Sequence, residues 1–211
     1  MNAPLLPVRS SEAIAHAVTA LRAGELIIIP TDTIYGLATL PENTEAIERL
    51  YAIRQRASEP AFPLVLAENK SMYTLARVNQ AAARLAQRFW PGALTILLPP
   101  GSDLSTAQRA MPIALRMPNY PALHPLLRAV GDVLFVSGAT CSGYPPAITA
   151  QEAADYFSEQ VAIILDGGPT PFGIPSTIVD CTQSPPLLVR RGAIPEEKIW
   201  ATLAPQFVKF S

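Results

Sequence analysis

Apolar runs alternate along the chain with segments whose apolar positions recur at helical spacing. The runs are five or six residues long and rich in Val, Ile and Leu, which is typical of strands buried within a sheet. The predicted strands lie at residues 25–30, 63–67, 93–98, 113–117, 133–137, 161–166, 176–180 and 187–191.

The segments between these runs predict helices, and several carry clear start and stop signals. Gly24 can end the first helix in a left-handed conformation. Thr149 and Glu152 form the T-x-x-E capping box that precedes another helix. The helices are expected at residues 10–23, 43–54, 70–77, 80–89 and 121–130, and from about residues 149 and 195 onward.

Helices and strands interleave, but three strands follow one another closely between residues 161 and 191. This order favours an α/β fold in which helices pack on a mixed sheet, rather than a purely parallel doubly wound sheet. The chain has 211 residues, 49% of them hydrophobic. That is enough for one full-sized core, so we expect a single domain over residues 1–211.

Charge and cysteine usage exclude several classes of protein. The net charge of −1 produces no global field toward nucleic acid, although a local basic patch remains compatible with it. Cys141 and Cys181 have neither metal-ligand spacing nor a disulfide framework, which favours a reducing, cytoplasmic location. Residues 1–13 lack the apolar segment of a signal peptide, and no apolar run reaches membrane length.

The common catalytic motifs are absent, and the cations are biased toward arginine. The chain contains no P-loop, no dinucleotide fingerprint, no zinc-protease motif and no nucleophile elbow. His16 and His124 lie on predicted helices, where packing or surface roles are expected. Thirteen of the sixteen cations are arginines. This reflects either a coding bias or a need for planar forks that bind phosphate and carboxylate, and only position can decide.

Polar residues gather at the ends of the predicted strands. In open α/β sheets, ligands collect in the crevice outside strand ends. Hydroxyls together with arginines suit a ligand that carries carboxylate and phosphate groups. Each residue alone is explained equally well as an ordinary turn or cap, so the argument rests on the set. Its members are Thr31, Asp32, Thr33, Tyr35, Arg54, Arg56, Arg116, Ser137, Thr140, Ser142, Ser176, Thr177, Arg190 and Arg191.

Several of these residues belong to short motifs that follow a recognisable order. The motifs are P-T-D-T-I-Y-G-L, R-x-R, F-W-P-G-A-L-T, A-L-R-M-P, S-G-x-P, D-G-G-P and S-T-I-V-D, ending in L-V-R-R-G. In this order and spacing, the chain resembles the YrdC-like family of threonylcarbamoyl-AMP synthases in its short, single-domain form. The resemblance runs from about residue 12 to residue 195.

The resemblance implies a fold and a reaction. The family fold is a twisted open mixed sheet around a concave, positively charged cavity. The family reaction joins L-threonine, bicarbonate and ATP, with Mg²⁺, into threonylcarbamoyl-adenylate and releases pyrophosphate. The product serves the tRNA-modification machinery that makes threonylcarbamoyladenosine in tRNA. Some members also bind double-stranded RNA.

The resemblance also assigns residues to two sides of a site. Thr33, Arg116 and Ser176 match the amino-acid side, where Thr31, Asp32 and Tyr35 would shape the loop and Gly36 its turn. The ATP side is matched by Arg54, Arg56, Thr95, Thr140, Ser142 and Arg190. No side chain is assigned as a nucleophile and no metal ligand is expected, so catalysis would rest on positioning and on stabilising phosphate charge.

Three departures from the family pattern fall on the ATP side. Arg54 stands where the family has lysine, and Pro60 stands near the place of a Lys or Asn. Gly138-Ala139-Thr140 replaces the family's S-A-N. The alternative is therefore a divergent paralogue that binds nucleotide or double-stranded RNA with weak or no synthase activity. A purely structural module is disfavoured by the intact amino-acid side.

Overall fold

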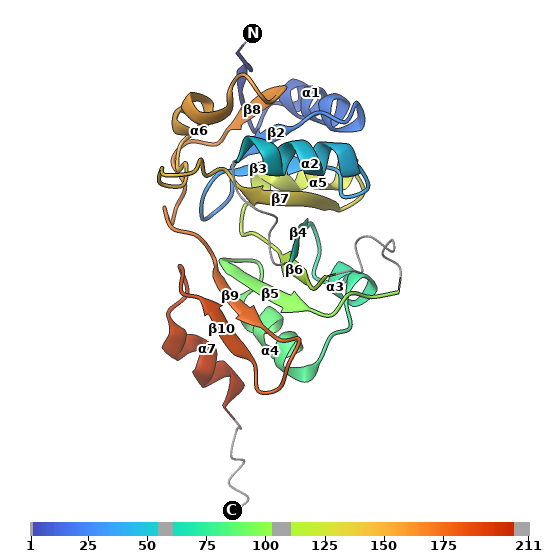
Figure 1. Ribbon diagram of the computed structural model, residues 1–211, viewed down its shortest axis with the longest axis vertical. Helices are drawn as coiled ribbons and strands as arrows, with labels where there is room; N and C mark the ends of the chain where they lie inside the picture. Colours follow the sequence, from blue (N-terminus) through green and yellow to red (C-terminus); the bar gives the residue numbers. More distant parts are fainter. Residues whose placement is uncertain (1, 55–60, 103–110, 205–211) are drawn as a thin grey trace, which may run out of the picture.

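The strands join in one mixed sheet. The structure, a computed structural model, describes residues 2–54, 61–102 and 111–204. Within these ranges ten strands form the sheet in the order β1-β8-β2-β3-β7-β4-β6-β5-β9-β10 (Figure 1). The pairs β1–β8, β2–β8, β4–β6 and β5–β9 are parallel, and the other pairs are antiparallel. The expected mixed α/β sheet is confirmed.

The chain forms these strands and the helices that cover them at the following bounds. The strands are β1 (Leu5–Pro7), β2 (Ile27–Ile29), β3 (Gly36–Thr39), β4 (Phe62–Leu66), β5 (Leu94–Leu98), β6 (Ile113–Arg116), β7 (Val133–Gly138), β8 (Ile163–Asp166), β9 (Thr177–Asp180) and β10 (Leu187–Arg190). The helices are α1 (Ser11–Arg22), α2 (Thr44–Ile53), α3 (Ser71–Leu75), α4 (Gln80–Phe89), the 3₁₀ turn η2 (Pro121–Leu123), α5 (His124–Ala129), α6 (Ala150–Phe157) and α7 (Glu196–Leu203).

The predicted helices and strands are all present, with small shifts at their ends. The capping box of Thr149 and Glu152 starts α6, and Gly24 follows α1 with a φ of 79°. The sequence did not predict β1 or β3. β1 is a short edge strand that includes a proline, and β3 has the sequence G-L-A-T without a run of β-branched residues. Neither carries the signal that identifies the other strands.

The family pattern implied that Gly36 forms a turn, but the structure places it in a strand. It begins β3 and pairs with Ile29 on one side and Gly138 on the other. A Cβ atom at this position would lie 2.6 Å from Cγ1 of Val136. Glycine is therefore required by the close approach of the neighbouring strand rather than by backbone conformation.

The sheet is buried on both faces, and strand β2 shows how the sequence achieves this. Ile28 belongs to the larger core cluster, which contains buried residues of α2, α4, α6 and α7. Its neighbours Ile27 and Ile29 belong to the second cluster, which is formed with α1 and α5. Successive side chains of a strand point to opposite faces, so three consecutive isoleucines fill both layers.

Candidate functional site

The loop that joins β2 to β3 is organised by the hydroxyl of Thr31. This oxygen accepts hydrogen bonds from the backbone N–H groups of Thr33 (3.1 Å) and Ile34 (3.3 Å), and it donates to the carbonyl oxygen of Ile34 (2.7 Å). The hydroxyl of Thr33 lies 3.1 Å from it. Threonine side chains stabilise turns in this way. The dense hydroxyls after β2 therefore fix the shape of the loop.

Arg116, at the end of β6, reaches this loop. Its Nη1 donates to the hydroxyl of Thr33 at 2.6 Å, its Nη2 donates to Oδ1 of Asp32, and its Nε donates to the carbonyl oxygen of Gly92 at 3.2 Å. Guanidinium has five N–H groups, so these contacts with described residues leave two for a ligand. The fork is thus held in a fixed orientation before any ligand binds.

The Asp32–Arg116 ion pair lies almost entirely inside the protein. The Asp32 side chain is 3% exposed and that of Arg116 is 11% exposed. Burial lowers the pKa of Arg116 from its usual value; Asp32 opposes this shift, and the nearby charge of Arg190 adds to it. Two arginines against one carboxylate leave an excess of positive charge, which favours an anionic ligand.

Ser176 directly precedes β9 and bonds to residues of β5 and β10, the two strands that flank β9 in the sheet. Its hydroxyl lies 2.7 Å from the hydroxyl of Thr95 on β5 and accepts a hydrogen bond from Nη2 of Arg190 at 3.1 Å. Nε of Arg190 donates to the carbonyl oxygen of Ser176, also at 3.1 Å. The sequence had assigned Ser176 to the amino-acid side and the other two to the ATP side. The structure brings all three together in one hydrogen-bonded group.

Arg54 lies in the interior, where its side chain reaches Ser137 on strand β7. It follows α2 as its C-cap residue, is 3% exposed, and its Nη1 donates to the hydroxyl of Ser137. Its charge is therefore held by the protein rather than presented to solvent. Arg56 and Pro60, the other ATP-side positions of this segment, lie outside the described residues.

The G-A-T segment that replaces S-A-N packs directly against the β2–β3 loop. A Cβ atom at Gly138 would lie 2.8 Å from Cδ1 of Ile34, so the isoleucine occupies the space that a serine side chain would need. The backbone N–H of Ala139 donates to the carbonyl oxygen of Tyr35 at 2.8 Å. Thr140, the last residue of the segment, is buried, whereas Ser142 is exposed in the turn that follows.

The structure reveals two contacts that the sequence analysis missed. Asp32 was expected only to shape the loop, but it is the ionic partner of Arg116. An acidic residue between buried strand-end residues must find a cation, and this could have signalled the pair. The contact between Ile34 and Gly138 left no signal in the sequence, because it depends on the antiparallel pairing of β3 with β7.

The part of the chain that the structure describes contains neither a metal-binding cluster nor a membrane-spanning helix. Among residues 2–54, 61–102 and 111–204, no group of three or more His, Cys, Asp or Glu side chains could hold a metal ion. Within the same ranges, no helix has both the length and the apolar character needed to cross a bilayer.

Comparison with known proteins gives clear matches. The family model Sua5_yciO_yrdC, described as telomere recombination, matches residues 19–192. The chain is 34% identical over 196 residues to the threonylcarbamoyl-AMP synthase of Bacillus subtilis, with 91% of this chain covered. It is 35% identical over 178 residues to the enzyme of that name from Pseudoalteromonas translucida, with 79% of this chain covered.

Solved structures show the same architecture. The crystal structure of Pyrococcus abyssi Sua5 complexed with L-threonine matches with a TM-score of 0.84 and 30% identity, over 90% of this chain. This chain spans 57% of the P. abyssi chain and 57% of the Bacillus enzyme, but 92% of the Pseudoalteromonas enzyme.

Proposed function

Because the chain belongs to the Sua5/YciO/YrdC family, we propose that it is a threonylcarbamoyl-AMP synthase, which joins L-threonine, bicarbonate and ATP into threonylcarbamoyl-adenylate and releases pyrophosphate. The observation that carries the proposal is the contact of Arg116 with Thr33. It places a pre-oriented guanidinium fork beside the loop of the family's amino-acid motif.

The amino-acid end of the site is formed around this fork. The carboxylate of L-threonine binds the two N–H groups of Arg116 that remain for a ligand, in the bidentate geometry that arginine suits. Asp32 and Thr33 hold the fork still, so little ordering is needed when the substrate binds. A complex of P. abyssi Sua5 with L-threonine supports this substrate.

The phosphate end of the site centres on Arg190 and the hydroxyls of Ser176 and Thr95. In the reaction, the threonine amine bonds to the carbon of bicarbonate with loss of water. The resulting carbamate oxygen attacks the α-phosphorus of ATP as the bond to pyrophosphate breaks. No side chain forms a covalent bond; the residues hold the reactants together and stabilise phosphate charge. Mg²⁺ arrives as part of the ATP substrate.

The wider proposal places the product in tRNA modification, with tRNA and the modification machinery as downstream partners in the cytoplasm. Direct contact with RNA falls to Arg190 and Arg191, at the exposed end of β10. Arg54 is excluded from such contact because it is buried against Ser137. The whole chain, residues 1–211, acts in this proposal as one domain.

A second function is favoured by one observation on the ATP side. Arg54 stands where the family has lysine, and it is enclosed by the protein rather than open to a phosphate. A divergent paralogue that binds nucleotide or double-stranded RNA, with weak or no synthase activity, accounts for this arrangement. The two functions differ in whether the chain releases pyrophosphate when ATP, threonine and bicarbonate are all present.

The test is pyrophosphate release by the purified chain with ATP, Mg²⁺, L-threonine and bicarbonate. The synthase releases pyrophosphate only when all components are present, and loses this in Arg116→Gln but not in Arg84→Gln, which changes an exposed arginine of α4. Release that is unaffected by omission of threonine contradicts the proposal. Nucleotide binding without pyrophosphate release favours the paralogue.

A further inference from the structure

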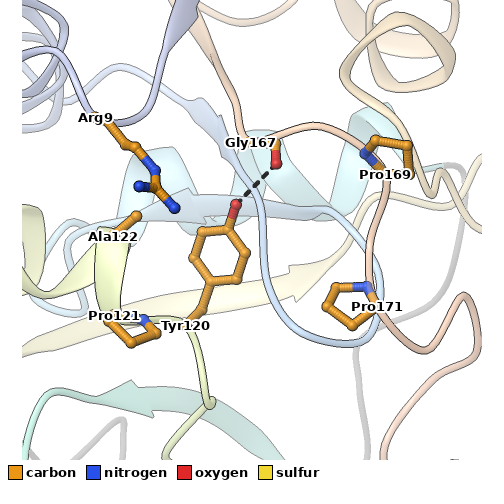
Figure 2. A pocket seen from close by; sticks show the side chains of 7 residues that line it. All are labelled: Arg9, Tyr120, Pro121, Ala122, Gly167, Pro169 and Pro171. Carbon is orange, nitrogen blue, oxygen red and sulfur yellow. Dashed lines mark hydrogen bonds between the residues drawn. The ribbon is translucent and has the colours of Figure 1, made fainter.

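A cavity of about 510 Å³ lies outside the residues assigned to the synthase reaction. Three segments form it: Arg9 ahead of α1, residues 120–122 at the start of η2, and residues 167–171 after β8 (Figure 2). This volume falls within the range of sites that bind small organic molecules. Nothing in the proposed reaction uses it.

The walls of the cavity are fixed by hydrogen bonds from two tyrosines. The hydroxyl of Tyr120 donates to the carbonyl oxygen of Gly167 at 3.1 Å. The hydroxyl of Tyr35 accepts from the N–H of Gly167 at 3.1 Å and donates to the carbonyl oxygen of Gly168 at 2.8 Å. These bonds hold the 167–171 segment to the sheet, so the cavity does not have to form when a ligand arrives.

The cavity is mainly apolar, with rigid surfaces on two sides. Figure 2 shows Tyr120 on one side of the opening and Pro169 and Pro171 on the other. Proline rings have almost no conformational freedom to lose, and the Tyr120 ring is anchored through its hydroxyl. Flat walls of this kind suit a planar, largely apolar body.

One charged group points into this space. The guanidinium of Arg9 lies beside the Tyr120 ring in Figure 2, and no ion pair or hydrogen bond to it is found among residues 2–54, 61–102 and 111–204. The acid closest in sequence to the lining glycines, Asp166, uses its Oδ1 to accept the N–H of Gly168 at 2.8 Å. Within the described part of the chain, Arg9 has no such bond and can pair with an anionic group, while Asp166 keeps its negative charge near Tyr120.

We propose that this cavity is a second ligand site, for a small organic anion whose carboxylate or phosphate binds Arg9 and whose planar body packs between Tyr120 and the two prolines. A bare inorganic anion would leave the apolar walls uncovered, and a neutral ring would gain nothing from the charge of the exposed Arg9. The ligand class is therefore set by both features together. The site goes beyond the proposed synthase function and does not depend on it.

The test is an NMR titration of the isotope-labelled chain with benzoate, phenyl phosphate and benzamide. We expect both anions to shift the backbone amide signals of Ala122, Gly167 and Gly168. Benzamide has the ring without the charge, and we expect it to bind at least about tenfold more weakly. The tighter of the two anions identifies carboxylate or phosphate as the preferred group. Equal binding of benzamide overturns the proposal.

Variants locate the binding. Arg9→Gln should weaken both anions at least about tenfold, while Arg84→Gln, on the distant helix α4, leaves them unchanged (Figure 1). Ala122→Leu adds bulk inside the cavity and should abolish binding; if that variant does not fold, Arg9→Gln alone carries the test. Unchanged binding in Arg9→Gln overturns the proposal. So does benzoate binding that is lost in Arg116→Gln, because the anion would then occupy the synthase site instead.

Discussion

The guanidinium of Arg116 donates a 2.6 Å hydrogen bond to the hydroxyl of Thr33, across 83 positions of sequence. This bond joins the end of β6 to the loop after β2, although three strands separate β2 from β6 in the sheet. The loop after β2 and the arginine side chain cross this distance together, and the charge of Arg116 is matched by Asp32. The amino-acid end of the site is thus assembled by the fold itself before a substrate is present.

Replacing Arg116 should separate the two ends of the site. Arg116→Gln removes the fork that binds the threonine carboxylate, so we expect threonine affinity to fall by about 2–4 kcal/mol, or 30- to 1000-fold. Affinity for ATP should change little, because Arg190 and Ser176 remain. Calorimetry with each ligand measures both values, with Arg84→Gln as the matched control. Threonine binding equal to that of the unmodified chain would overturn the assignment.

The same substitution should also destabilise the fold, through Asp32. Without its partner, the buried carboxylate is left uncompensated, and such losses cost about 3–5 kcal/mol. Asp32→Asn combined with Arg116→Gln removes both charges and should recover much of this stability. Urea unfolding of the two single variants and the double variant gives the coupling energy. Strictly additive effects would show that the pair contributes nothing to stability.

The fold was largely predictable because its signals are local. The isoleucines of β2 and the capping box of Thr149 identify their elements without knowledge of the rest of the chain. β3 was missed because its residues G-L-A-T have little preference for strands, and the strand exists only through pairing with β2 and β7. Tertiary pairing overrode local preference there.

The site was predictable in its membership but not in its contacts. Thr33, Arg116, Ser176 and Arg190 were all identified from strand ends and family motifs, and the structure joins them in two hydrogen-bonded groups. The pairing of Asp32 with Arg116 depends on strand order across the sheet, which no local pattern encodes. For the same reason, the sequence could not show that Arg54 is enclosed against Ser137.

Stability should fall at high pH because of Tyr35. Burial raises the pKa of this phenol from 10.0 to about 12. Its contribution to stability is therefore complete below pH 10 and is lost as the pH rises from 10 to 12, with a slope of at most about 1.4 kcal/mol per pH unit. Denaturant unfolding measures this loss. Tyr35→Phe should reduce this slope without abolishing it, because burial also raises the pKa of the Cys181 thiol from 9.0 to about 12. Tyr73→Phe, which changes an exposed tyrosine, should leave the slope unchanged. The same slope in both variants would contradict this prediction.

RNA binding, if it accompanies the synthase reaction, should depend on Arg190 and Arg191. The net charge of −1 provides no general attraction, so binding must rely on local phosphate contacts and should weaken steeply as salt increases. Arg191→Gln should make the slope of the logarithm of the RNA-binding constant against the logarithm of salt concentration shallower by about one. Arg191 pairs with Glu196 at 2.7 Å but is 83% exposed, so its removal should leave the fold intact. Salt-independent binding would exclude this surface.

Finally, Ile34 should determine whether the family's serine can be restored at position 138. A Cβ atom at Gly138 would lie 2.8 Å from Cδ1 of Ile34, closer than real contacts allow. Gly138→Ser therefore forces the end of this half-buried side chain to shift, and should cost about 1 kcal/mol of stability by overpacking. Ile34→Val removes the obstructing methyl group, so the double variant should recover most of that loss.

Unfolding of both single variants and the double variant gives the coupling free energy between positions 34 and 138, which we expect to be about 0.5 kcal/mol. Calorimetry with ATP then separates the two proposed functions. In a decayed synthase, serine in the Ile34→Val background should tighten ATP binding, because a lost polar contact returns. In an active enzyme whose ATP pocket already compensates for the missing serine, the same change should be neutral or harmful to ATP binding. Additive stability effects would show that Ile34 and Gly138 are not matched to each other, and would remove the structural explanation for glycine at this position.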